Sequence, residues 1–210
     1  MAKHWIVLIG SPNELSEISS LLELPPSLVL LPIAVGEKDW NDRLSPYPCE
    51  RVFPKGASFL GQAEAFLSEI QTRLLHELAL VEEKPASIII AGYSLAGLFA
   101  LYAAFESALF DTAISCSGSL WFPGFVERYP LGNKNPNLTY VYLCLGEDEA
   151  KTKNPILATI QAKTEAFQMA LKQRGIACDL TFHPGGHFAD PNGRMVEALA
   201  KIITKKLQVS

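Results

Sequence analysis

Short apolar runs alternate with amphipathic stretches along most of the chain. Such runs are typical of strands buried on both faces of a sheet, and they occupy residues 5–9, 28–35, 88–90, 112–116, 140–145 and 178–182. Between them, apolar residues recur at helical spacing in residues 14–22, 63–81, 95–102, 155–174 and 194–207. This alternation predicts a single α/β domain over residues 1–210, with a mostly parallel sheet of about six strands and helices on both faces.

Prolines interrupt this pattern in two places. Pro32 lies inside the second apolar run and indicates a bulge or an edge strand, because proline has no N–H to donate to a neighbouring strand. Residues 36–57 contain Pro46, Pro48 and Pro54, which predicts a long loop with little regular structure. A loop of this length inside a compact domain is usually functional.

The composition narrows the class of protein. Hydrophobic residues make up 49% of the chain and charged residues 19%, which indicates a globular protein rather than a disordered one. The formal net charge is −4, and no basic run is long enough to predict a nucleic-acid partner. No apolar stretch reaches membrane-spanning length, and the first residues lack a signal-peptide layout. We therefore expect a cytoplasmic protein that binds neither nucleic acid nor membrane.

The cysteines give no sign of a metal or a disulfide framework. They are scattered and form neither a Cys-x-x-Cys pair nor a cluster with histidine, which predicts free thiols and no zinc site: Cys49, Cys116, Cys144 and Cys178. This pattern suits the reducing cytoplasm, and we expect no metal or organic cofactor.

The strongest candidate for chemistry is Ser94, in the sequence Gly-Tyr-Ser-Leu-Ala between a predicted strand and a predicted helix. In a nucleophile elbow the serine lies at the apex of a sharp turn, and small residues flank it because strand and helix approach closely. Gly92 and Ala96 occupy the two small positions, with Gly97 directly behind. The alternative is a serine that only caps the helix. The strand before it and the helix after it favour a nucleophile.

A serine hydroxyl needs a base within hydrogen-bonding reach. His187 follows the last predicted strand in a Gly-Gly-His turn, and active groups collect at the C-terminal ends of parallel strands. His183 lies four residues earlier and is the main rival. His4 and His76 are interpreted as ordinary surface residues.

The third member of a triad would be a carboxylate that orients the histidine. Three acidic residues follow the strand at 140–145. An acid at this place lies between Ser94 and His187 in the sequence, and the order serine, acid, histidine is that of α/β-hydrolases. Glu149 is the first choice because it lies in the loop, three residues past Gly146, and Asp148 and Glu147 follow in that order. The alternatives are a solvated acidic turn or helix N-terminus, and a Ser-His dyad without an acid.

The other site residues are predicted from their position after strands. An oxyanion hole uses the backbone amide after the nucleophile and one from the loop after an earlier strand, which points to Leu95 and Ser11. Trp121 and Phe122 follow the strand at 112–116 and are expected to line the substrate pocket. Simple core packing is the equal alternative for both.

These residues also carry a resemblance. The chain resembles the α/β-hydrolase superfamily over nearly its whole length, and within it the esterases related to esterase D and to the siderophore (enterobactin-type) esterases. The stretches that carry it are 92–102, 117–121, 146–149 with 151–154, and 186–188. The resemblance implies Ser94 as nucleophile, His187 as base and an acid within 147–149. It also places the segment 39–46, with Trp40, over the mouth of the active site.

The chain departs from this group in two respects. It is short and lacks the first antiparallel strands, and only a loop around residues 130–136 stands where many hydrolases carry a lid, so the substrate does not carry over. The resulting hypothesis is a serine esterase that cleaves a small-molecule carboxylic ester through an acyl-enzyme. A thioesterase or acyltransferase on the same fold and a non-catalytic binding protein are the alternatives. The sequence leaves the oligomeric state open.

Overall fold

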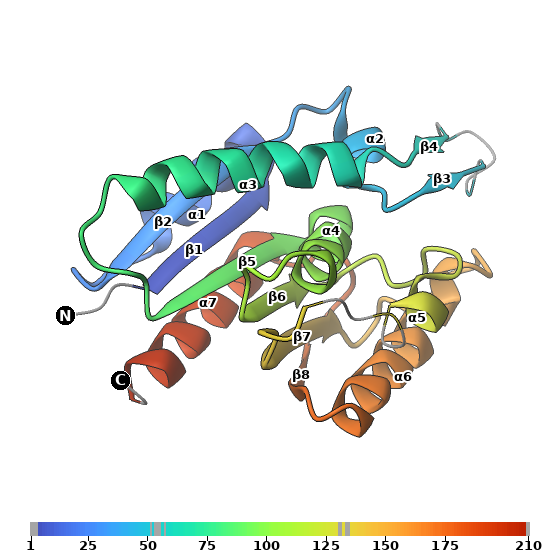
Figure 1. Cartoon of the computed structure of the whole chain (residues 1–210). Helices are drawn as coiled ribbons and strands as arrows, with labels where there is room; N and C mark the ends of the chain where they lie inside the picture. The colour runs from blue at the N-terminus through green and yellow to red at the C-terminus, as the bar shows by residue number, and fades with distance from the viewer. Residues whose placement is uncertain are drawn as a thin grey trace.

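The computed structural model describes residues 4–50, 52, 56, 58–129, 132 and 135–208. Its centre is a six-stranded sheet in the order β2-β1-β5-β6-β7-β8 (Figure 1). Every neighbouring pair of these strands is parallel, as the alternation of apolar runs predicts. The strands are β1 (His4–Gly10), β2 (Leu28–Ala34), β5 (Ser87–Tyr93), β6 (Thr112–Cys116), β7 (Tyr140–Gly146) and β8 (Ala177–His183).

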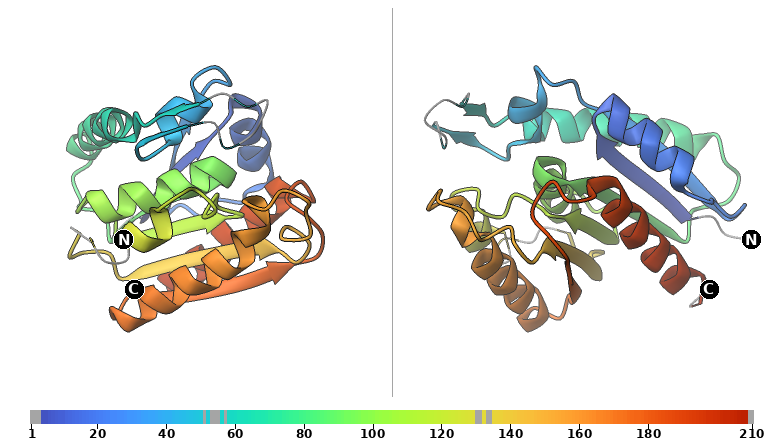
Figure 2. Two further views of the ribbon diagram at one scale, coloured as in Figure 1. Left: turned by 90° about the vertical axis from the view of Figure 1, so that its right-hand side faces the viewer. Right: turned by 180° about the vertical axis from the view of Figure 1, so that it is seen from behind.

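Helices cover both faces of the sheet, which explains why the strands are apolar without alternation. One face packs against α1 and α7, which lie in front of the sheet in the right panel of Figure 2. The other face packs against α3, α4 and α6. The helices are α1 (Pro12–Leu21), α3 (Ala63–Ala79), α4 (Ser94–Glu106), α6 (Ile160–Gln173) and α7 (Pro191–Leu207), with the short α2 (Trp40–Leu44), α5 (Phe125–Arg128) and the 3₁₀ turn η1 (Leu157–Thr159).

The helix α4 is the most deeply buried helix of the domain. Every residue from Leu95 to Phe105 is buried, so this helix is apolar all round rather than amphipathic. Its small residues allow a close approach to the sheet, and a Cβ on Gly97 would lie 2.9 Å from the Ser115 Oγ. The start of α4, where Ser94 lies, is therefore held firmly in place.

The structure confirms one prediction about an individual element and corrects another. Pro32 lies in β2, which forms one edge of the sheet, as its missing N–H predicts. The prediction of an irregular loop over residues 36–57 is wrong in part, because this segment contains α2 and the strand β3 (Pro48–Cys49), which pairs antiparallel with β4 (Phe59–Leu60). Pro54 and Ala57 lie outside the described residues.

Tertiary contacts, and not local propensity, stabilise this segment. Leu44 is fully buried in the core, and α2 packs against α3, α4 and β4. The Asp42 Oδ1 accepts the N–H of Leu60 at 3.0 Å, and the Ser45 Oγ accepts the N–H of Gly61 at 3.0 Å. These bonds attach the hairpin to α2 at the end of the sheet toward which the strands point (Figure 1).

His4 also differs from its interpretation as a surface residue. It begins β1 and is 3% exposed. Burial, assisted by the nearby Lys206 and opposed by Asp111, lowers the pKa of its ring. His76, in contrast, lies exposed in the last turn of α3.

None of the helices in the described ranges combines the length and apolar character needed to cross a membrane.

Candidate active site

Ser94 lies at the apex of the turn between β5 and α4. Its φ of 56° is in the left-handed region, which is strained for a residue with a side chain. A Cβ on Gly92 would lie 2.3 Å from the carbonyl oxygen of Ala96, so only glycine fits there. The helix N-cap is Tyr93, without a side-chain capping bond. Ser94 therefore has the geometry of a nucleophile elbow and not that of a helix cap.

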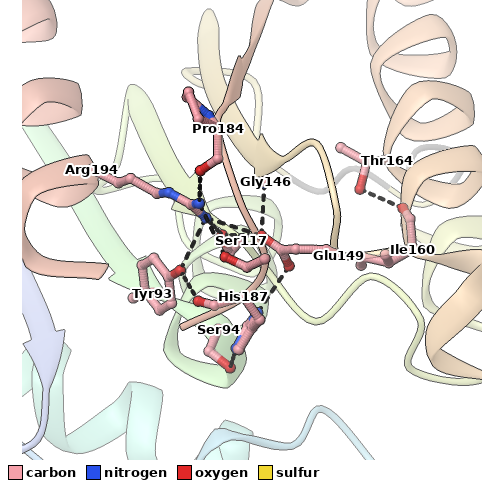
Figure 3. Close-up of polar contacts among 11 residues, drawn as sticks. Tyr93, Ser94, Ser117, Gly146, Glu149, Ile160, Thr164, Pro184, His187 and Arg194 are labelled. Carbon is pink, nitrogen blue, oxygen red and sulfur yellow. Dashed lines mark hydrogen bonds and ion pairs between the residues drawn. The ribbon is translucent and has the colours of Figure 1, made fainter. Parts of the chain in front are cut away.

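Ser94, His187 and Glu149 form one chain of hydrogen bonds (Figure 3). The Ser94 Oγ lies 3.0 Å from the His187 Nε2, and the His187 Nδ1 lies 2.9 Å from the Glu149 Oε2. The three residues follow β5, β8 and β7, so the C-terminal edge of the sheet brings them together. The arrangement can pass a proton from the serine hydroxyl to the imidazole while a carboxylate fixes the ring.

The rival residues lie elsewhere. The His183 Nδ1 is 3.7 Å from the Glu197 Oε2 on α7. Asp148 forms an exposed ion pair with Lys151, and Glu147 is exposed. Of the three acidic residues after β7, only Glu149 bonds to a histidine among the described residues.

The Glu149 carboxylate is buried and yet carries its charge readily. Its side chain is 4% exposed, and burial alone would raise its pKa. Hydrogen bonds from the His187 ring, from the Ser117 Oγ at 2.6 Å and from the Gly146 N–H at 2.7 Å outweigh burial, so the pKa of Glu149 is held below its usual value. An ionised acid is the form that orients a neighbouring imidazole.

Three further residues surround this chain, and sequence reasoning missed them. Arg194 donates to Glu149, Ser117 donates to the same carboxylate, and the Tyr93 hydroxyl donates to the backbone oxygen of His187. One signal was readable: Arg194 lies beside Met195 and Ala198 on the apolar face of α7, where an unpaired arginine would be costly.

A cavity of about 290 Å³ opens at Ser94 and His187. Trp40 and Trp121 line it, together with Phe59, Leu157 and Ile160. Phe122 does not: it is fully buried and packs edge-on against Tyr47 and Phe59. Its prediction as a pocket residue is therefore wrong, and the core alternative holds.

Ser11 also departs from its predicted role. Its N–H donates to the Glu14 Oε2 at 2.7 Å, and its hydroxyl accepts the N–H of Glu14, which is the capping box of α1. Ser11 lines a neighbouring cavity of about 440 Å³ and not the one that contains Ser94. Its amide is thus engaged elsewhere. The Leu95 N–H remains suitable, because the first amides of a helix have no partner within it.

Within the described part of the chain, no group of three or more histidine, cysteine, aspartate or glutamate side chains could hold a metal ion.

The comparisons with known proteins fit this architecture. No family model matches the chain. It is 27% identical over 176 residues to the uncharacterized protein YbbA of Bacillus subtilis (strain 168), covering 82% of this chain and 70% of that one. Among solved structures, it resembles the siderophore hydrolase EstA from Aspergillus nidulans, with a TM-score of 0.72, 18% identity and coverage of 100% of this chain and 84% of that one.

Two bacterial structures are similar to a comparable degree. The IroE-like serine hydrolase from Shewanella oneidensis has a TM-score of 0.75 and 15% identity over 97% of this chain and 71% of that one. The enterobactin esterase FES from Shigella flexneri has a TM-score of 0.66 and 20% identity over 97% of this chain but only 53% of that one. The predicted α/β-hydrolase fold is confirmed, and the solved structures that share it include ones named as a siderophore hydrolase and an enterobactin esterase.

Proposed function

We propose that this protein is a serine hydrolase that cleaves a carboxylic ester through an acyl-enzyme. One observation carries the proposal: the hydrogen-bonded chain from Ser94 through His187 to Glu149 opens into an apolar cavity. The structural neighbours named as siderophore and serine hydrolases support the reaction class. Burying polar and charged groups carries a desolvation cost, and networks of such groups are concentrated at functional sites.

The mechanism follows from the geometry. The His187 Nε2 takes the proton as the Ser94 Oγ attacks the ester carbonyl, and the imidazolium returns that proton to the departing alcohol. Glu149 holds the proton on Nδ1, which leaves Nε2 free to accept. Water then repeats the attack on the acyl-enzyme with the same base. No step requires a metal or an organic cofactor.

The developing oxyanion needs two donors. The Leu95 N–H at the start of α4 is the first. Asn41 is the second in our proposal, in place of Ser11, because it lies in α2 and lines the same cavity as Ser94. The carboxamide of Asn41 makes no hydrogen bond to another residue in the described ranges, so its NH₂ group is available to a substrate.

Replacing Asn41 with alanine should lower kcat by about 10²- to 10³-fold, the usual cost of one oxyanion donor. The half-buried side chain carries little of the packing, so the thermal midpoint should stay near that of the wild type. Steady-state hydrolysis of p-nitrophenyl butyrate measures the effect. A variant that retains full kcat would remove Asn41 from the oxyanion hole.

The lining of the cavity also suggests the kind of substrate. Trp40, Phe59, Trp121, Leu157 and Ile160 present apolar surface to it, and such surface favours an uncharged, apolar acyl or alcohol group. We therefore expect short and medium p-nitrophenyl esters to be turned over more readily than a succinyl ester of the same length.

Substituting the three acidic residues one at a time tests the role of Glu149. Glu149→Gln should lower kcat by about 10⁴-fold, whereas Asp148→Asn and Glu147→Gln should keep it. The Gly146 N–H and the Ser117 and Arg194 donors would hold the glutamine oxygen and turn its NH₂ toward Nδ1. That NH₂ would force the proton onto Nε2, where it blocks acceptance from serine. Three equal, small losses would indicate a Ser-His dyad.

A fluorophosphonate probe tests the proposed function directly. We expect the folded protein to be labelled once, at Ser94, and heat-unfolded protein not to be labelled. Intact-protein and peptide mass spectrometry identify the site. Folded protein that neither reacts with the probe nor hydrolyses any p-nitrophenyl ester would favour a binding protein that keeps the hydrolase fold.

A further inference from the structure

Arg194 is a buried cation outside the predicted site. Its side chain is 3% exposed, although arginine is rarely buried unless it is paired. It also lies near the start of α7, where the helix dipole disfavours positive charge. Partners must offset both costs.

The partners of Arg194 come from three loops of the candidate active site, those that follow β6, β7 and β8 (Figure 3). Nη1 donates to the Glu149 Oε1 at 3.2 Å and to the Ser117 Oγ at 3.3 Å. Nη2 donates to the backbone oxygens of Pro184 at 2.8 Å and Gly186 at 3.0 Å. One guanidinium group therefore links the loop that carries the acid to the loop that carries the histidine.

The two carboxylate oxygens of Glu149 have different hydrogen-bond partners. Oε1 accepts from Ser117, from the Gly146 N–H and from Arg194, while Oε2 accepts from the His187 ring. A carboxylate with one oxygen held by three donors cannot rotate freely. The oxygen that faces the imidazole is thereby fixed.

The contacts to the histidine loop hold a segment that is flexible by composition. Gly185 has a φ of +85°, and two consecutive glycines leave the backbone few restraints of its own. Arg194 binds the carbonyl of Gly186, and the Tyr93 hydroxyl binds the carbonyl of His187. Two neighbouring carbonyls just before and at the histidine are therefore held from the protein interior.

We infer that Arg194 is the positioning residue of this site. It holds the Glu149 carboxylate in its orientation, and it fixes residues 184–187 so that His187 reaches both Ser94 and Glu149. Arg194 does not line the substrate cavity and acts only through these neighbours. The inference rests on the proposed serine-hydrolase function.

Few other groups near Glu149 can change charge around neutral pH. Burial raises the pKa of Tyr93 to about 12 and that of Cys116 well above its usual value, so both stay neutral. The charged or titratable groups nearest to Glu149 along the chain on the packed elements are Glu147, Asp148 and Lys151 after β7, Cys144 on β7, His183 on β8, and Glu197 on α7. The same strands and helix also carry Tyr140, Tyr142, Cys178, Asp179, Lys201, Lys205 and Lys206. A His183→Gln variant controls for the one histidine among them.

Two substitutions separate the charge of Arg194 from its geometry. Arg194→Met removes both. Without the cation, the Glu149 carboxylate loses a neighbouring positive charge and takes up a proton at higher pH. The acid limb of kcat/KM should therefore move up by about one pH unit, and kcat should fall by about 10²-fold with little change in KM. Arg194→Lys keeps the charge but lacks the planar fork, so the acid limb should stay in place while kcat still falls.

Lys205→Met is the matched control. It removes one cation from the same helix, eleven residues or about 16 Å farther along, where the lysine pairs with Asp179. Its kcat and pH profile should equal those of the wild type. Circular dichroism and thermal melting check that each variant is folded. If Arg194→Met fails to fold, the kcat of Arg194→Lys alone tests the role of Arg194.

The outcomes distinguish this inference from the function on which it rests. Wild-type protein that is folded but inert to esters and to the fluorophosphonate probe would overturn both. An active wild type with an unchanged acid limb in folded Arg194→Met, or with full kcat in Arg194→Lys, would overturn only the role of Arg194. A shifted limb in the methionine variant and an unshifted one in the lysine and Lys205→Met variants would support it.

Discussion

Replacing Ser94 with alanine should reduce ester hydrolysis by about 10⁶-fold, the scale of loss when a serine hydrolase loses its nucleophile. The reason is chemical: alanine has no oxygen to form the acyl-enzyme, so His187 has no proton to accept. The residual rate would come from binding and from oxyanion stabilisation alone. Hydrolysis of p-nitrophenyl butyrate by wild type and variant, purified side by side, measures the loss. The fluorophosphonate probe should fail to label the variant.

Stability measurements on the same residue separate catalysis from folding. Ser94→Ala keeps a Cβ at a φ of 56°, so its free energy of unfolding should equal that of the wild type within about 0.5 kcal/mol. Ser94→Gly removes the strain of a side chain in that region and should be more stable by about 1 kcal/mol. An alanine variant that keeps more than a trace of activity at normal stability would exclude Ser94 as the nucleophile.

The sheet and the elbow could be read from the sequence because both depend on local patterns. Each apolar run had to be buried on two faces, and only a parallel sheet between two helical layers provides that. Gly92 and Ala96 around Ser94 indicate the close approach of strand and helix. The structure confirms it, because a Cβ on Gly92 would lie only 2.3 Å from the carbonyl oxygen of Ala96. The chain order of Ser94, Glu149 and His187 followed from the same topology.

Other features depend on contacts that no local pattern contains. Trp121 and Phe122 are neighbours with the same apolar character, yet the first lines the cavity and the second is fully buried. Which of two adjacent side chains faces the cavity depends on the turn after β6. Likewise, α2 is stabilised by the packing of Leu44 into the core. The prolines that follow it predict an irregular loop instead, and no local pattern shows that Leu44 is buried.

Ser11 is a different case, because its signal was present in the sequence. The spacing of Ser11 and Glu14 is that of a capping box, and it predicts that the Ser11 N–H bonds to a side chain. Reasoning from strand order alone assigned this amide to the oxyanion hole. The capping box of α1, and not the strand order, therefore determines the partner of the Ser11 N–H.

Replacing His187 with alanine should lower kcat by about 10⁵- to 10⁶-fold, whereas His183→Ala should keep most of the activity. The two rings lie four residues apart but have different partners: the His187 Nε2 is 3.0 Å from the Ser94 Oγ, and the His183 Nδ1 faces Glu197. Without an imidazole, the Ser94 hydroxyl keeps its proton, and the departing alcohol receives none.

Added imidazole gives this prediction a specific control. The His187→Ala variant leaves a space beside Ser94 that opens into the cavity, because the His187 ring is 27% exposed and lines that cavity. Imidazole in solution should enter and restore part of the hydrolysis, with a rate that rises with its concentration. It should not rescue Ser94→Ala, which lacks the nucleophile itself. Full activity in His187→Ala, or its loss in a folded His183→Ala, would assign the base to His183, the last residue of β8.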